Sequence, residues 1–454
     1  MNGLPQDPEQ RYAFARNIGR PSSVLDVGCA GAMYSAIAKE RGARVVGIDE
    51  RSNALAVQRL DEFVEAKGEA LLSLAPLKGR TFELILSDHA FHHAEDPEAL
   101  LRTFADHLEG GGHVLVSFLA PGARKKGQGG RVFSRSEVVQ MVERAGLDIM
   151  RIDVGSVVPW AERLAGTDEI RKIVERPSST IASFGGVLVP TEAIVAQAIP
   201  SIVGYEWVVV ARKPNRPGKL SLTVGMLTLN EESAVEKMID EIRQFAPDAK
   251  ILLVDSSSDQ TPLLAEAKGA RVIRQLPARG HGPAMERLMY EAAKESEALI
   301  YLDCDFTYPA NMIPRIRELL EQGADVVNAS RTHRKPEAMP LPNFLANRVF
   351  AGTAQVVHGI ATTDVHSGMR GYRSTLIRAF NFDGEGDAIP LDTLILPAKS
   401  NYDVIEMPID YHERVGQSKL AKFRGTVWSF ARIASAIGKG KRVRLGSGFR
   451  KLPA

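Results

Sequence analysis

Residues 24–50 read VLDVGCAGAMYSAIAKERGARVVGIDE, and this segment gives the clearest indication of the fold of the first half of the chain. An apolar run reaches Asp26, a turn containing Gly28 and Gly31 follows, and a segment with helical spacing leads to a second apolar run ending at Asp49. Glycine has no Cβ, so this turn can bend sharply beside a ligand. The free amides of the following helix favour an anionic group, and an acid about twenty residues further on can bond a ribose.

The same alternation continues in both directions from this stretch. In the first half we expect strands at 23–27, 43–48, 82–87 and 113–118, and helices at 30–41 and 97–108. Three glycines at 110–112 are expected to interrupt the regular structure before the strand at 113–118. In the second half we expect strands at 220–229, 251–254, 271–273 and 298–302. Strands that alternate with helices predict an α/β fold with parallel sheets covered by helices.

Composition indicates two domains. A chain of 454 residues is too long for one ordinary core, and the Pro-, Gly- and Lys-rich stretch around 213–220 predicts a linker. Cys29 and Cys304 fall in different halves, so we expect no structural disulfide and a reducing compartment. There is no apolar signal core and no run of ~18 apolar residues. We therefore expect a cytoplasmic protein, with peripheral contact at the inner face of the cell membrane left open.

Residues 24–50 resemble the first motif of class I methyltransferases, Asp-x-Gly-x-Gly-x-Gly, with Ala30 and Ala32 at two glycine positions. Residues 82–118 and 132–152 resemble later parts of the same fold, and the resemblance covers 12–212. It implies a Rossmann-like fold and S-adenosyl-L-methionine as cofactor. The implied contacts are Asp26, Gly28 and Gly31 at the methionine part, Asp49 at the ribose, Glu69 at the adenine, and Ser87 and Asp88 at the pocket floor.

Three histidines follow this floor, namely His89, His92 and His93. One of them could act directly in catalysis, or two of them could be exposed residues at a helix entry. His92 and His93 are adjacent and point to different sides, so a shared metal site is not expected.

A second constellation lies in ALIYLDCDFTYP, residues 298–309. Asp303 and Asp305 end a buried strand, and residues i and i+2 project to the same side, so both carboxylates can face one hard divalent cation. Such a cation bridges a nucleotide diphosphate and stabilises the departing charge. Two solvated turn carboxylates are the alternative. The preceding Asn-Glu-Glu at 230–232 and Val-Asp-Ser-Ser at 254–257 favour the metal site.

This half resembles family-2 glycosyltransferases with the GT-A fold, most closely dolichol-phosphate mannose synthase and related polyprenyl-phosphate glycosyltransferases. The resemblance covers 221–440 and includes RGHGPAMERL (279–288), ASRTHRK (329–335), DVHSGMRGYR (364–373) and YHERVGQSKL (411–420). It implies metal-dependent, inverting transfer from GDP-mannose or a UDP-hexose to a polyprenyl phosphate or a glycan. The family's processive synthases carry a Gln-x-x-Arg-Trp motif and membrane helices that we do not find, so we expect single transfers.

The resemblance also assigns residues. Those expected at the substrates or the metal are Asp255 and Glu231 at the nucleoside, His281 (where a Lys is usual) in the donor loop, Asp303 and Asp305 at Mg²⁺ or Mn²⁺, and Arg331, Arg370, Arg414 and Lys419 at the diphosphate or an acceptor phosphate. Fixed cations stabilise developing negative charge. A hydroxyl acceptor would need a base, for which Asp364 is the candidate. Asp364 could instead cap Ser367.

Beyond Glu413 the only charged residues are basic, and 441–454 is predicted to be a basic tail. Phe423, Val427, Phe430, Ala434 and Ile437 form an apolar stripe at helical spacing. Segment 421–451 is therefore either an interfacial membrane helix or an ordinary helix packed on the domain. No recognition motif suggests nucleic acid.

Together these features predict a glycosyltransferase fused to a methyltransferase that acts on a sugar hydroxyl. Three alternatives stay open. The first domain could be an inactive cofactor-binding or structural module, it could methylate a non-sugar substrate, or the second domain could transfer sugar to a protein or small metabolite.

Overall fold

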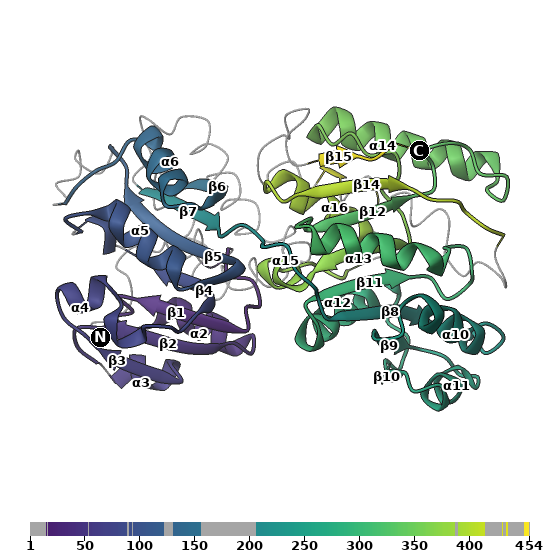
Figure 1. Ribbon diagram of the computed structural model, residues 1–454, viewed down its shortest axis with the longest axis horizontal. Coiled ribbons are helices and arrows are strands. Elements are labelled where there is room, and N and C mark those ends of the chain that lie inside the picture. The colour runs from purple at the N-terminus through teal and green to yellow at the C-terminus, as the bar shows by residue number, and fades with distance from the viewer. Residues whose placement is uncertain are drawn as a thin grey trace. The chain divides into compact units, whose positions relative to one another are not determined.

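The computed structural model describes residues 15, 17–52, 54–88, 90–92, 94–121, 130–155, 206–385, 389–413, 429, 433–434 and 449–453. The chain divides into two compact units, one comprising Met1–Asn215 and Arg378–Asn381 and the other Arg216–Ile377 and Phe382–Ala454. Each unit contains one sheet with helices packed against it (Figure 1).

The sheet of the first unit has seven strands in the order β3-β2-β1-β4-β5-β7-β6. All neighbours are parallel except β7, which runs antiparallel to β5 and β6. The strands are β1 (Ser23–Val27), β2 (Arg44–Asp49), β3 (Glu62–Glu65), β4 (Phe82–Ser87), β5 (Leu108–Leu119), β6 (Asp148–Gly155) and β7 (Glu206–Arg212). The parallel core of the sheet agrees with the strand–helix alternation of the sequence.

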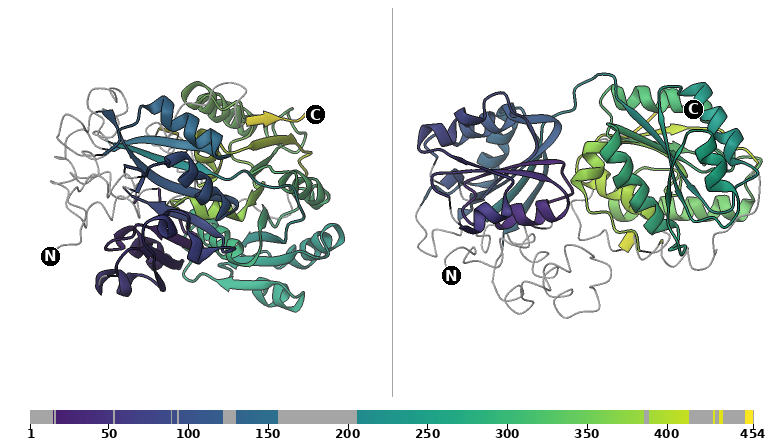
Figure 2. Two further views of the ribbon diagram at one scale, coloured as in Figure 1. Left: turned by 60° about the vertical axis from the view of Figure 1, so that its left-hand side comes forward. Right: turned by 90° about the horizontal axis from the view of Figure 1, so that it is seen from below.

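Helices cover both faces of this sheet, which is seen nearly edge-on in the right-hand view of Figure 2. They are α2 (Met33–Glu40), α3 (Ala54–Arg59), α4 (Glu69–Leu72), α5 (Pro97–Asp106) and α6 (Arg135–Arg144), with short 3-10 turns at η1 (Ala75–Leu77) and η2 (Ala90–His92). Successive strand residues alternate between faces. Accordingly, Val24 packs in a core with Ala38 of α2, and Leu25 packs in a separate core with Phe104 of α5.

The glycines at 110–112 do not interrupt the regular secondary structure, contrary to the expectation from the sequence. They lie inside β5, where pairing with β4 changes register between Phe82↔Leu108 and Leu84↔His113. Gly111 has φ 78°, a conformation that glycine adopts without a steric penalty. The glycine run therefore forms a bulge within one long strand.

The second sheet has eight strands in the order β10-β9-β8-β11-β13-β12-β14-β15. β13 is antiparallel to β11 and β12, and the remaining pairs are parallel. The strands are β8 (Leu222–Thr228), β9 (Lys250–Asp255), β10 (Arg271–Arg274), β11 (Ala298–Leu302), β12 (Val326–Ser330), β13 (Met369–Arg373), β14 (Val404–Pro408) and β15 (Phe449–Lys451). Because β13 is antiparallel, the residues that precede it lie at the edge where β11 and β12 end.

The helices of the second half are α10 (Val235–Phe245), α11 (Thr261–Ala267), α12 (His281–Glu295), α13 (Ile313–Glu321), α14 (Leu341–His358), α15 (Ser374–Ala379) and α16 (Ile389–Lys399), with the 3-10 turn η4 (Ala310–Met312). Met238 of α10 and Ile316 of α13 share one core with Val224 of β8. α12 packs on β8, β9 and β11. Gly225 permits this contact, since a Cβ there would lie 2.9 Å from Leu288.

Part of the predicted basic tail belongs to the sheet, because Phe449–Lys451 pairs in parallel with Val404–Glu406. Most of segment 421–451 lies outside the described residues. None of the helices described here has the length and apolar character needed to cross a bilayer.

Candidate functional site

In the first unit, three carboxylates gather where β1, β2 and β4 end. Asp26 lies in β1, Asp49 is the last residue of β2, and Asp88 follows β4. The carboxyl ends of parallel strands form one edge of a sheet, and ligands of open α/β folds bind at that edge. The structure therefore brings together the residues that the sequence predicted at the methionine part, the ribose and the floor.

Asp26 is 6% exposed, and its Oδ2 accepts a hydrogen bond from Ser35 Oγ at 2.6 Å. Burial raises the pKa of Asp26 to about 7, against the lowering effect of the Ser35 bond, and the charges of Asp88 and Asp49 raise it further. A concentration of negative charge at this edge complements a cationic group. S-adenosyl-L-methionine carries a sulfonium and an ammonium, so the residues present fit this cofactor.

The turn after β1 keeps a left-handed backbone at three alternate positions. Gly28 has φ 72°, Ala30 has φ 40° and Ala32 has φ 50°. Ala30 N donates to Asp49 Oδ2 at 2.8 Å, which ties the turn to the end of β2. The alanines therefore hold the conformation that glycines would adopt, at a cost of roughly 1–2 kcal/mol each.

One of the predicted cofactor contacts is placed differently. The Ser87 side chain is fully buried and donates to Val27 O at 3.1 Å, so it ties β4 to β1 rather than lining a floor. Glu69 begins the four-residue helix α4 and is exposed. Asp88 accepts a hydrogen bond from Ser117 Oγ at 2.8 Å. His92 is 7% exposed in η2, while His89 and His93 lie outside the described residues.

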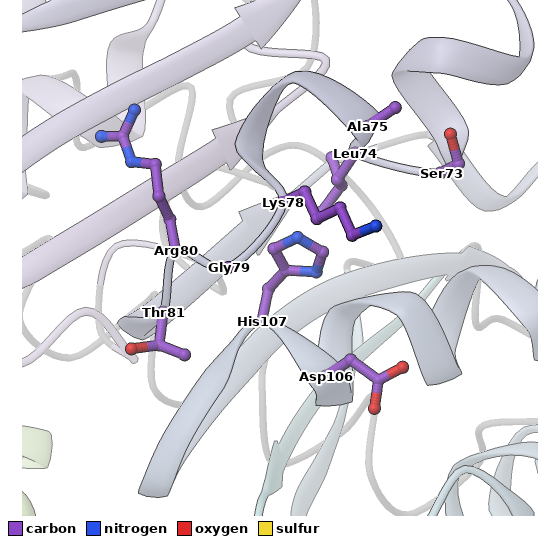
Figure 3. A pocket seen from close by; sticks show the side chains of 9 residues that line it. All are labelled: Ser73, Leu74, Ala75, Lys78, Gly79, Arg80, Thr81, Asp106 and His107. Carbon is purple, nitrogen blue, oxygen red and sulfur yellow. The ribbon is translucent and has the colours of Figure 1, made fainter.

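A hollow of about 460 Å³ in the same unit is lined by residues before β4 and β5. Figure 3 shows Lys78 lying over the His107 ring in this hollow. Because it adjoins the amino ends of these strands, it is not part of the edge that carries Asp26 and Asp49.

In the second unit, the loops after β8 and β9 are joined by hydrogen bonds. Asn230 N donates to Ser257 Oγ at 2.7 Å, and Ser258 N donates to Asn230 Oδ1 at 2.8 Å. Glu231 N donates to Thr261 Oγ1 at 2.8 Å. These bonds hold Glu231, which is partly exposed, beside the β9 loop.

Asp255 was expected to contact a nucleoside, but its side chain is completely buried. Its carboxylate accepts bonds from Thr228 Oγ1 and Ser257 Oγ, each at 2.6 Å, and forms an ion pair with Arg274. This geometry corrects the prediction, because Asp255 holds the loops after β8 and β9 together through Thr228 and Ser257. In its ion pair, the Arg274 side chain is 37% exposed and is the member that reaches solvent.

Asp303 and Asp305 follow β11 directly, as the sequence indicated. Asp303 is partly exposed, and a Cβ added to Gly368 would lie 2.4 Å from its Oδ2, so only glycine fits beside this carboxylate. Asp305 is 5% exposed, and its Oδ1 accepts from Thr307 N at 3.1 Å. Asp305 thus shapes the turn that carries the pair.

Arg331, just after β12, forms a buried ion pair with Asp364. Its Nε and Nη2 donate to the two carboxylate oxygens at 2.7 and 2.9 Å. The Arg331 guanidinium lies over the rings of Tyr308 and Tyr411, at 5.6 and 5.5 Å from their centroids. Burial alone would raise the pKa of Asp364, but the charge and hydrogen bonds of Arg331 outweigh burial and leave this pKa below its ordinary value.

The predicted roles of two residues change with this geometry. Asp364 accepts from Arg331 and from His366 N at 3.2 Å, so it is neither a free base nor a cap on Ser367. Arg370 is fully buried and donates to Asn328 Oδ1 at 2.6 Å, to Val365 O at 2.7 Å and to Pro390 O. Its donors face the protein, so Arg370 supports the 364–368 turn instead of contacting a phosphate.

Sequence reasoning missed Glu406 of β14, which is 3% exposed. Its carboxylate accepts from Thr363 N at 2.9 Å, Thr363 Oγ1 at 2.7 Å and Asn328 Nδ2 at 3.0 Å. These bonds anchor the start of the 362–368 turn. A lone acid within the apolar run VIEMP was the available signal. Tyr308 and Tyr411 were also missed, because no spacing links them to Arg331.

His281 begins α12, where the resemblance placed a donor loop. It lies close enough to His366 for its charge to act on that ring, although burial is the main cause that lowers the pKa of His366 to about 4. The remaining predicted phosphate contacts, Arg414 and Lys419, lie outside the described residues.

No cluster of three or more His, Cys, Asp or Glu side chains able to hold a metal occurs within the described parts of the chain. A hard cation can take its other oxygen ligands from a diphosphate and water. The Asp303–Asp305 pair, with the space left by Gly368, fits such a shared site.

Comparisons with known proteins match the two halves of the chain separately. The model of glycosyl transferase family 2 matches residues 223–380. A dolichyl-phosphate hexose transferase of Haloferax volcanii is 36% identical over 219 residues, covering 48% of this chain and 91% of that relative. The chain belongs to glycosyl transferase family 2. This family 2 glycosyltransferase also matches the model of a methyltransferase domain, over residues 4–152.

Other similarities concern one half each. A ubiquinone biosynthesis O-methyltransferase of Idiomarina loihiensis is 33% identical over 101 residues, covering 21% of this chain and 42% of that enzyme. A solved glucosyl-3-phosphoglycerate synthase of Mycobacterium tuberculosis, bound to Mn²⁺ and UDP, shows 20% identity and a TM-score of 0.36, covering 48% of this chain and 80% of that one. By the two family models and the hexose transferase relative, the chain is an enzyme that joins a methyltransferase domain to a family 2 glycosyltransferase domain.

Proposed function

We propose that the second domain, 221–440, transfers a hexose from GDP-mannose or a UDP-hexose to a polyprenyl phosphate, and that the first domain, 12–212, transfers a methyl group from S-adenosyl-L-methionine to a sugar hydroxyl. Relatives named for transfer to dolichyl phosphate and undecaprenyl phosphate support the lipid acceptor. A glycan hydroxyl is the alternative acceptor.

The environment of Asp364 is the observation that favours a phosphate acceptor over a sugar hydroxyl. Its carboxylate is buried, bound by Arg331 through both oxygens, and has a lowered pKa. A hydroxyl acceptor needs a base to take its proton. A phosphate monoester is already an anion near neutral pH, so it can attack without one. The geometry therefore supports an anionic acceptor better than a sugar hydroxyl.

In the proposed reaction an acceptor phosphate oxygen forms a bond to the anomeric carbon. The bond from that carbon to the donor diphosphate breaks, and the nucleoside diphosphate leaves with the electron pair. Mg²⁺ or Mn²⁺, when bound, would neutralise charge on this leaving group. Asp303 and Asp305 would hold the cation, and Arg331, fixed by Asp364 and the two tyrosines, would keep positive charge beside the transferring group.

Purified protein with a radiolabelled GDP-mannose and UDP-hexose panel, Mn²⁺ and a polyprenyl phosphate tests this function. We expect label in the organic phase, and a loss of roughly 100- to 1000-fold in rate for Asp303→Asn. Asp410→Asn is the matched control, since Asp410 is exposed and pairs only with exposed Arg334 in the contacts described. Label confined to the aqueous phase would exclude the lipid acceptor.

The methyltransferase activity rests on the conformation of the cofactor turn. Ala30 and Ala32 keep a left-handed backbone, and Asp49 holds Ala30 N. Replacement of two glycines therefore leaves the shape of the turn intact, which favours a binding domain. Calorimetry with S-adenosyl-L-methionine should show binding that Asp49→Ala weakens and Glu50→Gln does not. Absence of binding to the parent protein would leave a structural module.

We further propose a cytoplasmic protein that contacts the membrane peripherally, in part through 421–451. The support is indirect: the acceptors named for the relatives are membrane lipids, and the charged residues beyond Glu413 are basic. Anionic lipid attracts such a segment.

A further inference from the structure

Tyr308 lies in the loop after β11, shortly beyond Asp303 and Asp305, and contacts groups on both sides of the candidate glycosyl transfer site. It is 1% exposed. Burial raises the pKa of its hydroxyl well above the ordinary value for tyrosine, so this group stays protonated and neutral. A buried tyrosine can pack through its ring and form a hydrogen bond through its hydroxyl. Tyr308 does both, with different partners.

The Tyr308 hydroxyl binds the residue that packs against Asp303. Gly368 N donates a hydrogen bond to Tyr308 Oη at 2.5 Å. A Cβ on Gly368 would lie 2.4 Å from Asp303 Oδ2 and 2.8 Å from Tyr308 Cε2, so the main chain of Gly368 packs directly against both side chains. The place available to the Asp303 carboxylate therefore depends on where Tyr308 holds Gly368.

Other hydrogen bonds fix the residues on either side of Gly368. Tyr301 Oη donates to Ser367 O at 2.7 Å, and Ser367 Oγ donates to Met369 O at 3.1 Å. These bonds do not involve the Gly368 amide, whose acceptor is Tyr308. Removal of the Tyr308 hydroxyl should therefore release one peptide group beside Asp303 and leave the rest of the turn in place.

The ring of Tyr308 contacts Arg331, the cation of the site. Arg331 Cζ lies 5.6 Å from the centroid of the Tyr308 ring, within the range of a cation–π interaction. The Tyr411 ring meets the Tyr308 ring edge-on at 5.9 Å and lies 5.5 Å from the same guanidinium. The charges of Arg331 and Asp303 both act on the pKa of Tyr308, in opposite directions. Both groups therefore lie within electrostatic range of this one residue.

We propose that Tyr308 is a positioning residue for sugar transfer, which holds Asp303 through Gly368 and holds Arg331 through its ring. The inference rests on the proposed function, in which a cation on Asp303 and the guanidinium of Arg331 both act on the transferring group. Charges that are already in place stabilise a developing charge without a cost of reorganisation. Tyr308 would thus fix the separation between the bound cation and the guanidinium without itself touching substrate.

Manganese binding tests the hydroxyl without any turnover. Mn²⁺ is titrated into the full-length protein with saturating UDP or GDP, and the free ion is followed by electron paramagnetic resonance. We expect Tyr308→Phe to raise the Mn²⁺ dissociation constant roughly 10-fold, because Gly368 loses the bond that keeps it against Asp303. An unchanged dissociation constant in Tyr308→Phe would overturn the inference, as would an absence of Mn²⁺ binding by the parent with either nucleotide.

Tyr290→Phe is the matched control, because Tyr290 is a second buried tyrosine whose hydroxyl accepts from a main-chain amide. Tyr290 lies on α12, is 7% exposed, and its Oη accepts from Phe382 N at 3.0 Å. The two variants should lower the melting temperature by similar amounts, since each loses one bond of the same kind. Only Tyr308→Phe should weaken Mn²⁺ binding. Equal weakening by both variants would show a general effect of stability and would contradict the positioning role.

Sugar transfer tests the ring. At saturating Mn²⁺, Tyr308→Phe keeps a ring beside Arg331 and should retain the kcat of the parent. Tyr308→Leu should lower kcat roughly 10-fold at the same Mn²⁺ concentration, because Arg331 loses a cation–π partner. Tyr308→Met takes its place if the leucine variant does not melt cooperatively. An equal loss of kcat in the phenylalanine and aliphatic variants would remove the role of the ring.

The two measurements separate this inference from the proposed function. If no acceptor receives sugar from the parent while Mn²⁺ binding follows the expected order, the proposed function fails and the role of Tyr308 beside the cation stands. If the parent transfers sugar and Tyr308→Phe binds Mn²⁺ as the parent does, the function stands and the inference fails.

Discussion

Two alanines in the cofactor turn adopt backbone angles that favour glycine. Ala30 and Ala32 have φ 40° and 50°. We expect Ala30→Gly and Ala32→Gly each to stabilise the first unit by about 0.5–1 kcal/mol, because relief of the left-handed strain exceeds the added flexibility of the unfolded chain. Urea denaturation followed by Trp207 fluorescence measures this, with Trp160 and Trp428 replaced by Phe. Trp207 is 4% exposed and donates to Phe133 O at 2.9 Å.

The control for this prediction is Ala38→Gly, inside α2 and fully buried. There, glycine should destabilise the unit by about 1 kcal/mol or more, because it loosens a regular helix. If Ala30→Gly and Ala32→Gly were as destabilising as Ala38→Gly, the strain at the turn would not exist.

The raised pKa of Asp26 predicts how stability depends on pH. Between the ordinary aspartate pKa and about 7, the folded protein keeps a proton that the unfolded chain has released. Stability therefore falls as pH rises through this window, by an amount on the order of 4 kcal/mol for three pH units. Asp26→Asn should remove this contribution, so the variant should gain on the parent between pH 5 and 7.

The measurement is the same Trp207-monitored denaturation at a series of pH values. Ser35→Ala provides a second check, since the Ser35 bond lowers the pKa of Asp26 and its loss should move the window upward. A constant stability difference between Asp26→Asn and the parent at every pH would contradict the prediction.

At this scale, residues that follow a strand could be predicted and their partners could not. Asp303 and Asp49 stand where a strand ends, and the sequence marks that position. The motif at 364–373 identified Asp364 and Arg370 as candidate site residues, but it did not indicate which residues they contact. Their partners are distant in sequence, Arg331 by 33 positions and Asn328 by 42, so only the folded sheet shows that both side chains are engaged by the protein.

Among the elements, local periodicity predicted those with a simple pattern. The expected strands 82–87 and 298–302 coincide with β4 and β11. Prediction failed where a local signal had a tertiary use. The glycines of 110–112 read as a break but form a bulge in β5. Phe449–Lys451 lies in a basic stretch and still forms a strand, because it pairs with β14. Neither pairing is visible in a window of a few residues.

β14 supports the candidate site through Glu406, which predicts an effect far from the substrates. Glu406→Ala would remove the acceptor of Thr363 N and of buried Thr362 Oγ1, and one of the two acceptors of Asn328 Nδ2, which would keep Asp364 O. We expect a loss of about 3 kcal/mol in the stability of the second unit and a lower rate of sugar transfer, because the 362–368 turn loses its anchor. Circular dichroism during denaturation and the transfer assay measure the two effects.

Lys451→Ala is the matched control for β14. Lys451 lies 3.9 Å from Glu406 Oε1, and its side chain is 43% exposed, so this ion pair should contribute little. If Lys451→Ala proved as damaging as Glu406→Ala, the anchoring role would belong to the ion pair rather than to the bonds with the turn.

For the whole molecule, each candidate site is built from residues of a single unit. The carboxylates Asp26, Asp49 and Asp88 come from the first unit, and Asp303, Arg331 and Asp364 come from the second. A ligand that binds only the folded form of one unit stabilises that unit by mass action. The two ligands should therefore protect two different unfolding transitions, which calorimetry can separate.

We expect S-adenosyl-L-methionine at about 100 times its Kd to raise one transition by roughly 5–10 °C, and the preferred nucleotide sugar with Mn²⁺ to raise the other by a similar amount. Asp49→Ala should abolish only the first shift, and Asp303→Asn only the second. A single transition raised by both ligands would mean that the units unfold together. Loss of both shifts in either variant would show that ligand binding by each unit depends on the other unit. The two activities would then be thermodynamically coupled.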